Sequence, residues 1–302
     1  MLAFRHVQIR NSNSLKSSRS LLIAGAGDLG TRLAKLRVTR GEEVIALRRR
    51  EVSIAGGVRS LRVDLVTGEG FSGLPRRPDA LVFCAAPDKR TEADYRALYV
   101  DGLRRLLDAL EMPRLIFVSS TAVYAEDAGE WVDETTPPRM DAPVSREAGC
   151  RERPPRAEQF NGRVLLEAER ELAVHSGALV LRLSGIYGPG REMMVRRARE
   201  GSANRPRWSN RIHIDDAAAA LSHLLDIAAP ERVYLGSDDR PALESEVQTW
   251  LRAREGLPPA AQDTSPETGR RVSNARLRAS GWNPAYPDYR AGYSELLSQA
   301  SV

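Results

Sequence analysis

The sequence predicts an α/β protein built on a doubly wound parallel sheet. A short apolar run, Leu21 to Ala24, leads directly into a glycine-rich turn, and an amphipathic stretch from Thr31 to Thr39 and a second apolar run from Gly41 to Leu47 follow. Further along the chain, apolar runs and helical stretches continue to alternate. That alternation is typical of parallel strands joined by crossover helices.

The turn has the pattern G-x-G-x-x-G, and each glycine has its own physical purpose. Gly25 allows a tight turn out of the strand, Gly27 leaves room for a pyrophosphate, and Gly30 lets the helix pack closely on the sheet. The helix that follows would offer unpaired N–H groups to the phosphates, and Asp28 and Leu29 in the turn are expected to bind the cofactor with the glycines. We therefore predict a dinucleotide site on a Rossmann-type sheet, rather than a turn with a structural purpose alone.

Arginines follow the second predicted strand, as Arg48, Arg49 and Arg50. NAD-binding units usually carry an acidic residue here for the ribose 2′-OH, whereas guanidinium groups suit a 2′-phosphate. The sequence thus favours NADP, with NAD as the alternative and a solvated basic loop as the plainer interpretation. Asp64 and Leu65 end a third predicted strand. The Asp64 carboxylate would accept from the adenine amino group or cap the next turn.

Two further strands end in small or hydroxyl-bearing residues. The run from residue 79 to 86 ends in Ala85 and Ala86, and the run from 114 to 120 ends in Ser119 and Ser120. A helix is predicted between them, over residues 95–110. Ligands of such sheets bind outside the carboxyl ends of the strands. We expect all four residues to face the cofactor.

Composition excludes several other classes of protein. The 302 residues are 42% hydrophobic and 28% charged, an ordinary balance for a globular protein, and no apolar run is long enough to cross a membrane. Two cysteines and four histidines without ligand spacing predict neither a disulfide framework nor a metal site, and they point to a reduced, cytoplasmic location. The basic residues behind the net charge of +5 are spread through the chain, without aromatic residues interleaved among them. Nucleic acid is therefore not an expected partner.

Two segments stand apart from the alternating pattern. Residues 1–20 are basic and contain no acidic residue, which fits a disordered extension, a misplaced start or an organelle transit peptide. Residues 137–156 are rich in Pro, Arg and Glu without periodicity, which fits either a surface loop or a lid over the substrate.

Three later motifs carry a resemblance to a known family. They are S-S-x-x-V-Y from Ser119 to Tyr124, L-R-x-x-x-I-Y-G-P-G from Leu181 to Gly190, and I-H-x-D-D from Ile212 to Asp216. In this order and spacing, and together with the glycine turn, they resemble the extended short-chain dehydrogenase/reductases, which include NAD-dependent epimerases and dehydratases of nucleotide sugars. The likeness runs from about Leu21 to Tyr293.

The resemblance implies a catalytic Tyr-x-x-x-Lys pair and a substrate-binding Ser, of which only the Ser is found. Ser120 matches the Ser position, but the chain contains no Tyr-x-x-x-Lys. On the matching helix, Arg163 stands at the Lys position and Gln159, beside Phe160, stands at the Tyr position. Arginine could still hold the nicotinamide ribose, whereas glutamine cannot act as a general acid. The chain thus resembles a divergent branch of the family.

Other residues are candidates for the missing chemistry or for the substrate. Tyr124 and Tyr187 could replace the acid, although Tyr124 is usually structural in the family. Tyr187 and Arg211 would bind the substrate, and Arg211 would meet an anionic group. Arg191 and the arginines after it would contact a substrate diphosphate or form a solvated face.

Two structural predictions concern the same part of the chain. Arg182, on a strand that reads as buried, requires an internal carboxylate partner. Asp215 or Asp216 would be the N-cap of the helix that follows.

The predicted organisation has three parts. Residues 1–20 form an extension, residues 21–185 the cofactor-binding domain, and residues 186–302 a substrate lobe interleaved with returning strands of the main sheet. The expected partner is a small molecule such as a nucleotide sugar, with a homodimer as one option. Two functions stay open: an NADP-dependent oxidoreductase or sugar-nucleotide-modifying enzyme with a rearranged acid, and an inactive NADP(H)-binding sensor or scaffold.

Overall fold

The computed structural model describes residues 18–50, 54, 56–111, 114–138, 159–201, 205–261 and 263–299. The predicted N-terminal extension, up to residue 17, and the predicted insertion, from residue 139, lie outside these ranges.

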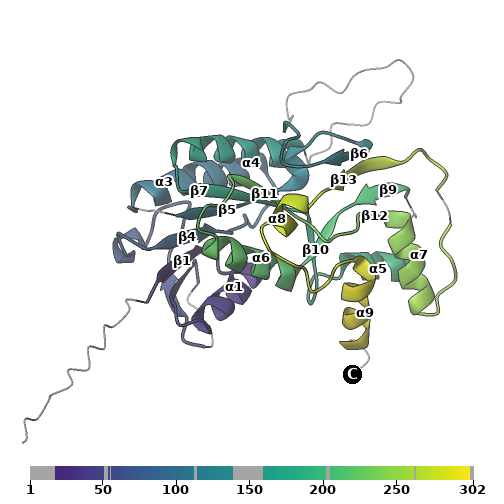
Figure 1. Ribbon diagram of the computed structural model, residues 1–302, viewed down its shortest axis with the longest axis horizontal. Helices are drawn as coiled ribbons and strands as arrows, with labels where there is room; N and C mark the ends of the chain where they lie inside the picture. The colour runs from purple at the N-terminus through teal and green to yellow at the C-terminus, as the bar shows by residue number, and fades with distance from the viewer. Residues whose placement is uncertain are drawn as a thin grey trace, which may run out of the picture.

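A seven-stranded parallel sheet forms the centre of the molecule, as Figure 1 shows. Its strands lie in the order β11-β7-β5-β4-β1-β2-β3. Their bounds are β1 (Ser20–Ala24), β2 (Glu43–Arg48), β3 (Arg59–Arg62), β4 (Ala80–Phe83), β5 (Leu115–Ser120), β7 (Ala178–Leu183) and β11 (Val233–Gly236). The chain moves outward from β1 to β3 and then returns through β4 to β11, so the predicted doubly wound α/β fold is confirmed.

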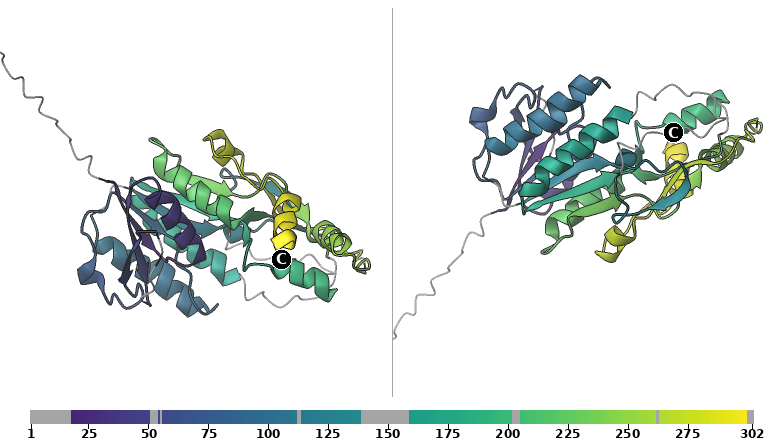
Figure 2. Two further views of the ribbon diagram at one scale, coloured as in Figure 1. Left: turned by 90° about the horizontal axis from the view of Figure 1, so that it is seen from below. Right: turned by 90° about the horizontal axis from the view of Figure 1, so that it is seen from above.

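Helices cover both faces of this sheet, as the two views in Figure 2 show. One face packs on α1 (Asp28–Val38) and α6 (Ile214–Asp226). The other packs on α2 (Glu92–Arg96), α3 (Leu103–Asp108) and α4 (Gln159–Glu171).

Alternation along each strand supplies the two cores. In β1, Leu21 and Ile23 face the first helix pair, whereas Leu22 and Ala24 face the second group. Both sets are almost fully buried, as a parallel sheet covered on both sides requires.

A smaller lobe stands at the end of the sheet, on the right of Figure 1. Its sheet has the order β12-β9-β13-β6, with β6 (Ala128–Val132), β9 (Arg207–Ser209), β12 (Ala242–Leu243) and β13 (Thr268–Val272). A separate pair joins β8 (Gly185–Tyr187) to β10 (Arg211–His213). The lobe's helices are α5 (Met193–Glu200), α7 (Glu244–Arg254) and α9 (Tyr289–Gln299), whereas α8 (Ala275–Ala279) packs on β11 of the main sheet. The division at residue 185 stays a prediction.

Two predicted helices differ from those found. Helix α1 begins at Asp28, three residues before the predicted Thr31, because the glycine turn leads into it directly. The predicted helix over residues 95–110 begins earlier, at Glu92, and consists of α2, a π-helical segment and α3. Within the π-helical segment, a Cβ on Gly102 would lie 2.9 Å from the carbonyl oxygen of Leu65. Close packing on the neighbouring loop therefore accompanies the change in helix geometry.

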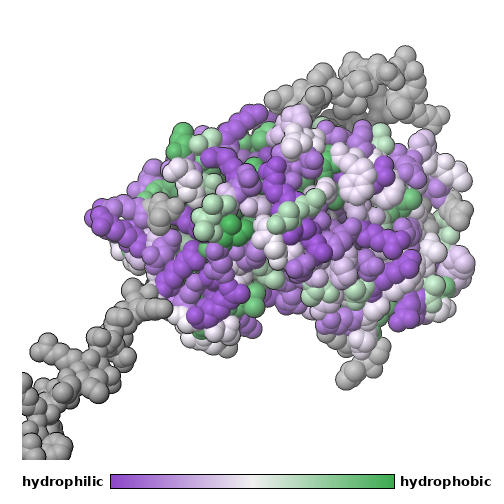
Figure 3. Space-filling view, in the orientation of Figure 1, coloured by the Kyte–Doolittle hydropathy of each residue, from purple (hydrophilic) through white to green (hydrophobic). Residues whose placement is uncertain are grey.

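Hydrophilic residues dominate the face shown in Figure 3, and hydrophobic residues appear there only in small groups. No helix within the described ranges is long and apolar enough to span a membrane.

Candidate functional site

The glycine turn between β1 and α1 is built as a phosphate site requires. Gly25 has a φ of +97°, and a Cβ there would lie 2.2 Å from the Cα of Ala85. A Cβ on Gly30 would lie 2.6 Å from the Gly25 carbonyl oxygen. A Cβ on Gly27, by contrast, would meet nothing within 4 Å. Two glycines are thus needed for packing inside the protein, and the third borders open space.

That open space lies at the N-terminus of α1. Gly27 is the N-cap residue, and no side chain caps the helix, so the first N–H groups of α1 lack an intrahelical partner. A pyrophosphate fits both features, since it needs hydrogen-bond donors and a close approach to the backbone. The residues present therefore fit a dinucleotide cofactor, with Asp28 and Leu29 in the first turn of the helix.

The arginines after β2 stand opposite an acidic residue. Arg49 forms two hydrogen bonds of 2.5 Å with the Asp88 carboxylate, which follows β4. Both side chains are exposed. Asp64 accepts from the backbone N–H groups of Val66 and Thr67, at 2.8 and 3.2 Å, so its carboxylate caps the turn after β3, one of the two roles that the sequence left open.

The end of β5 carries the two serines, and their hydroxyls have different partners. Ser119 is buried and donates to Glu169 of α4 at 2.6 Å. Ser120 accepts from the Ala122 N–H at 3.1 Å, and its own O–H proton goes to no acceptor among the described residues. Ser120 is therefore the serine that can donate to a ligand.

A buried ion pair stands behind these serines. Arg182 of β7 donates to the Glu169 carboxylate at 2.6 Å and to the Tyr124 hydroxyl at 2.8 Å. This confirms that Arg182 has an internal carboxylate partner. Tyr124 in turn donates to the Asp133 carbonyl at 2.8 Å, and burial raises the pKa of its hydroxyl. With both hydrogen-bonding directions of its hydroxyl satisfied inside the protein, Tyr124 has the geometry of a structural residue.

Helix α4 carries Arg163 and Phe160, at and beside the positions where the family resemblance predicts the Tyr–Lys pair. Arg163 points to α2, where it donates to Glu92 at 2.5 Å, and about half of its side chain is exposed. Phe160 lies edge-on to Tyr95 of α2, with ring centroids 5.3 Å apart. No sequence motif singles out Tyr95. Only the packing of α2 on α4 brings it to the first turn of α4.

The predicted substrate residues of the lobe are buried. Tyr187 packs on Tyr293 of α9, and its Oη would lie 2.0 Å from a Cβ on Gly292. Arg211 lies 5.6 Å over the Tyr289 ring and donates to Ser209 at 2.5 Å. Both carry a buried atom without a hydrogen-bond partner in the described structure, Oη in Tyr187 and Nη1 in Arg211. These two side chains lie where α9 packs on the rest of the lobe.

The prediction of an aspartate N-cap for α6 is wrong. His213 is the N-cap, and its imidazole accepts from the Asp215 N–H at 3.3 Å. Asp216 instead accepts from the backbone N–H groups of Ala285 and Tyr286, at 2.7 and 2.9 Å. The first aspartate, Asp215, pairs with Arg32 of α1. Each aspartate thus ties α6 to a segment distant in sequence, which an argument from local capping cannot reveal.

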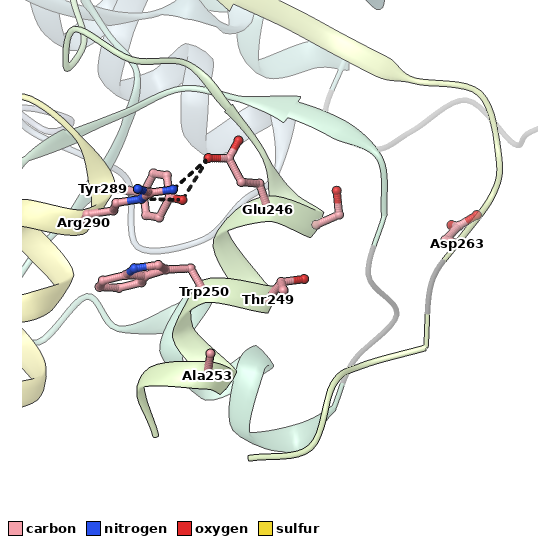
Figure 4. Close-up of a pocket in the computed structure, with 8 residues that line it drawn as sticks. Glu246, Thr249, Trp250, Ala253, Asp263, Tyr289 and Arg290 are labelled. Atoms are coloured by element: carbon pink, nitrogen blue, oxygen red, sulfur yellow. Dashed lines mark hydrogen bonds and ion pairs between the residues drawn. The ribbon is translucent and has the colours of Figure 1, made fainter. Parts of the chain in front are cut away.

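A hollow of about 570 Å³ lies in the lobe, between α7 and the start of α9 (Figure 4). Trp250 and Tyr289 form its aromatic wall, and Glu246 accepts from the Tyr289 hydroxyl at 2.9 Å. None of its lining residues belongs to the glycine turn or to β5. It is therefore separate from the cofactor crevice.

The chain matches the sequence model of the NAD dependent epimerase/dehydratase family over residues 21–236, from β1 to β11. The chain belongs to this family. The match includes the glycine turn, Ser120 and α4. The chain is accordingly an NAD(P)-binding protein of the epimerase/dehydratase type.

Several known proteins are similar to it. Protein YeeZ of Escherichia coli strain K12 is 29% identical over 229 residues, 72% of this chain and 76% of YeeZ. A candidate NAD-dependent epimerase/dehydratase from Methylobacillus flagellatus is 38% identical, with a TM-score of 0.78 over 95% of this chain and 100% of that one. UDP-glucose 4-epimerase of Thermus thermophilus, solved with NAD, is 23% identical, with a TM-score of 0.67 over 91% and 96%. This last likeness concerns the fold alone.

Proposed function

We propose that the chain binds NADP(H) in preference to NAD(H) and uses it to oxidise, reduce or epimerise a small hydroxyl- or carbonyl-bearing substrate, such as a nucleotide sugar. The single observation that carries this proposal is the open space beside Gly27 at the uncapped start of α1. Arg48, the last residue of β2, and Arg49, directly after it, support NADP. Their guanidinium groups suit a 2′-phosphate.

When bound, the cofactor would supply or accept a hydride. Ser120 would then donate its O–H to the reacting oxygen of the substrate, since the hydroxyl accepts from the Ala122 N–H and its proton has no acceptor among the described residues. Arg163 would leave Glu92 to meet the ribose hydroxyls, because that pair is exposed and costs little to break. The other cofactor contacts that we propose come from Asp64, Leu65, Ala85, Ala86 and the backbone of Ser119.

The proposed reaction also needs a general acid. We propose Tyr95 for it, ahead of Tyr124 and Tyr187, because its ring contacts Phe160 beside the family's tyrosine position. The Tyr124 hydroxyl is bonded on both sides, and Tyr187 lies in the core against α9. The alternative function, binding without turnover, is not favoured by family membership.

The test is a turnover panel of nucleotide sugars and simple carbonyl compounds with NADPH and NADP⁺. It compares the wild type with Tyr95→Phe and with the double variant Gln159→Tyr, Arg163→Lys. We expect wild-type turnover that Tyr95→Phe lowers by about 10²–10⁴-fold, the usual contribution of a general acid. Turnover that Tyr95→Phe leaves unchanged refutes Tyr95 as the acid. A silent wild type beside an active double variant refutes the proposal of catalysis and leaves cofactor binding.

A further inference from the structure

A chain of ion pairs joins the start of α1 to the substrate lobe. Arg191, in the loop before α5, places its Nε 3.2 Å from one carboxylate oxygen of Asp28. The other oxygen of Asp28 accepts from Arg32 Nε at 3.0 Å, and Arg32 continues to Asp215 of α6. We call these four residues the arginine bridge. It connects the first turn of α1, where the pyrophosphate is proposed to lie, with two segments from beyond residue 185.

The backbone that carries Arg191 is held firmly. The Arg191 N–H donates to the Gly188 carbonyl at 2.8 Å, which closes a tight turn. Gly188 has a φ of +137°, and a Cβ there would lie 2.8 Å from Ile214 and 3.0 Å from His213 Nε2. Only glycine suits such a backbone packed on the start of α6. The turn therefore fixes where the Arg191 side chain begins, while about two fifths of that side chain stays exposed.

A bound pyrophosphate at the start of α1 would need a cation beside it. Asp28 is the first residue of α1, and a carboxylate beside a pyrophosphate repels it. Arg32 is already shared between Asp28 and Asp215. Arg191 contacts Asp28 through Nε alone, so its two Nη groups have no side-chain partner among the described residues. A guanidinium with one edge bound to a carboxylate and its Nη groups available is well suited to a phosphate.

We propose that Arg191 is a cofactor-binding residue contributed by the lobe, which donates from Nη to the pyrophosphate of bound NADP(H) while Asp28 holds its Nε. This inference rests on the proposed function, since it presupposes a dinucleotide at the glycine turn. It makes the lobe part of the cofactor site, so that bound cofactor draws the turn at Gly188 and helix α1 together.

The experiment measures the Kd of NADPH by fluorescence titration, without substrate, for the wild type, Arg191→Gln, Arg191→Lys and Arg196→Gln. Arg196 is an exposed arginine of α5, five residues further along, and serves as the matched control. We expect Arg191→Gln to weaken NADPH binding by about 10- to 100-fold, the value of charge-assisted hydrogen bonds. Arg191→Lys should recover part of this loss, and Arg196→Gln should stay within about twofold of the wild type, as is usual for an uninvolved surface residue.

Melting curves separate this effect from misfolding. An exposed ion pair contributes little to stability, so the Tm of cofactor-free Arg191→Gln should match that of the wild type, while the rise in Tm on adding NADPH should shrink. Equal Kd values for the wild type and Arg191→Gln overturn the inference and leave the proposed function intact. A wild type that binds neither NADPH nor NADH overturns both. If Arg191→Gln weakens UDP binding but not NADPH binding, the arginine serves a substrate diphosphate and the inference is wrong.

Discussion

Replacing Gly27 with alanine separates binding from folding more cleanly than any other change in the glycine turn. Gly27 has φ −70° and ψ −153°, an extended conformation open to alanine. Its added Cβ would meet no atom of the protein within 4 Å. The space that this Cβ enters is the space proposed for the pyrophosphate. The variant should therefore fold normally and fail to bind the cofactor.

The expected magnitudes follow from the geometry. At a compatible position, a Gly→Ala change stabilises a protein by about 0.4–1 kcal/mol through the unfolded state, so Gly27→Ala should unfold at the wild-type Tm or slightly above. Gly25→Ala is the matched contrast, because its Cβ would lie 2.2 Å from the Cα of Ala85 at a φ of +97°. Backbone strain and overpacking together should cost it about 2–5 kcal/mol.

Calorimetric melting and NADPH titration of both variants form the assay. Gly27→Ala should keep its Tm and lose at least tenfold in NADPH affinity, whereas Gly25→Ala should melt several degrees lower. Wild-type NADPH affinity in Gly27→Ala would refute the glycine turn as the site. A lowered Tm in that variant would refute the claim that the space beside Gly27 is empty of protein.

Three more predictions concern charge and packing. Asp88→Asn should release Arg49 from its ion pair and raise the affinity for NADP⁺ relative to NAD⁺ several-fold, as measured by parallel titrations. An unchanged ratio of the two affinities would count against Arg49 as the 2′-phosphate ligand. Gly292→Ala should lower the free energy of unfolding by about 1–3 kcal/mol, because the added Cβ would lie 2.0 Å from Tyr187 Oη. Adding Tyr187→Phe to this variant should restore part of the lost stability, as measured by urea unfolding. Burial raises the pKa of Asp238 to about 8, so the folded state keeps a proton that the unfolded state loses near pH 4. The free energy of unfolding should therefore fall as pH rises from about 4 to 8, by at most about 1.4 kcal/mol per unit from this group. Asp238→Asn should flatten the profile, and a slope unchanged in that variant would contradict the shift.

The main sheet could be predicted from sequence because its determinants are local. Each buried parallel strand reads as a short apolar run, and the glycine spacing after β1 fixes the turn within ten residues. The need for glycine at Gly25 could also be predicted, because the turn requires a positive φ there. Turn geometry and burial both restrict which residues can stand at nearby positions, so they produce a sequence pattern.

The partners of charged residues could not be predicted in the same way. Arg182 clearly required a carboxylate, yet nothing local named Glu169 on a different element. Asp215 looked like a cap, but its partner Arg32 is 183 residues away. Such choices depend on which helices pack together. The pairing of α1 with α6 in the fold decides that Asp215 faces Arg32 and that His213 is left to cap the helix.

The same reasoning bears on the departure from the family's Tyr–Lys pattern that the sequence predicts at α4. The Glu169–Arg182–Tyr124 network fixes α4 against β5 and β7 from inside the core, while Arg163 meets Glu92 at the surface. The position of Ser120 therefore depends on buried contacts that the first turn of α4 does not supply. Gln159 and Arg163 can thus stand at the acid–base positions without loss of the fold. The glycine turn has no such freedom, because Gly25 and Gly30 are packed against the protein and Gly27 borders the proposed cofactor directly.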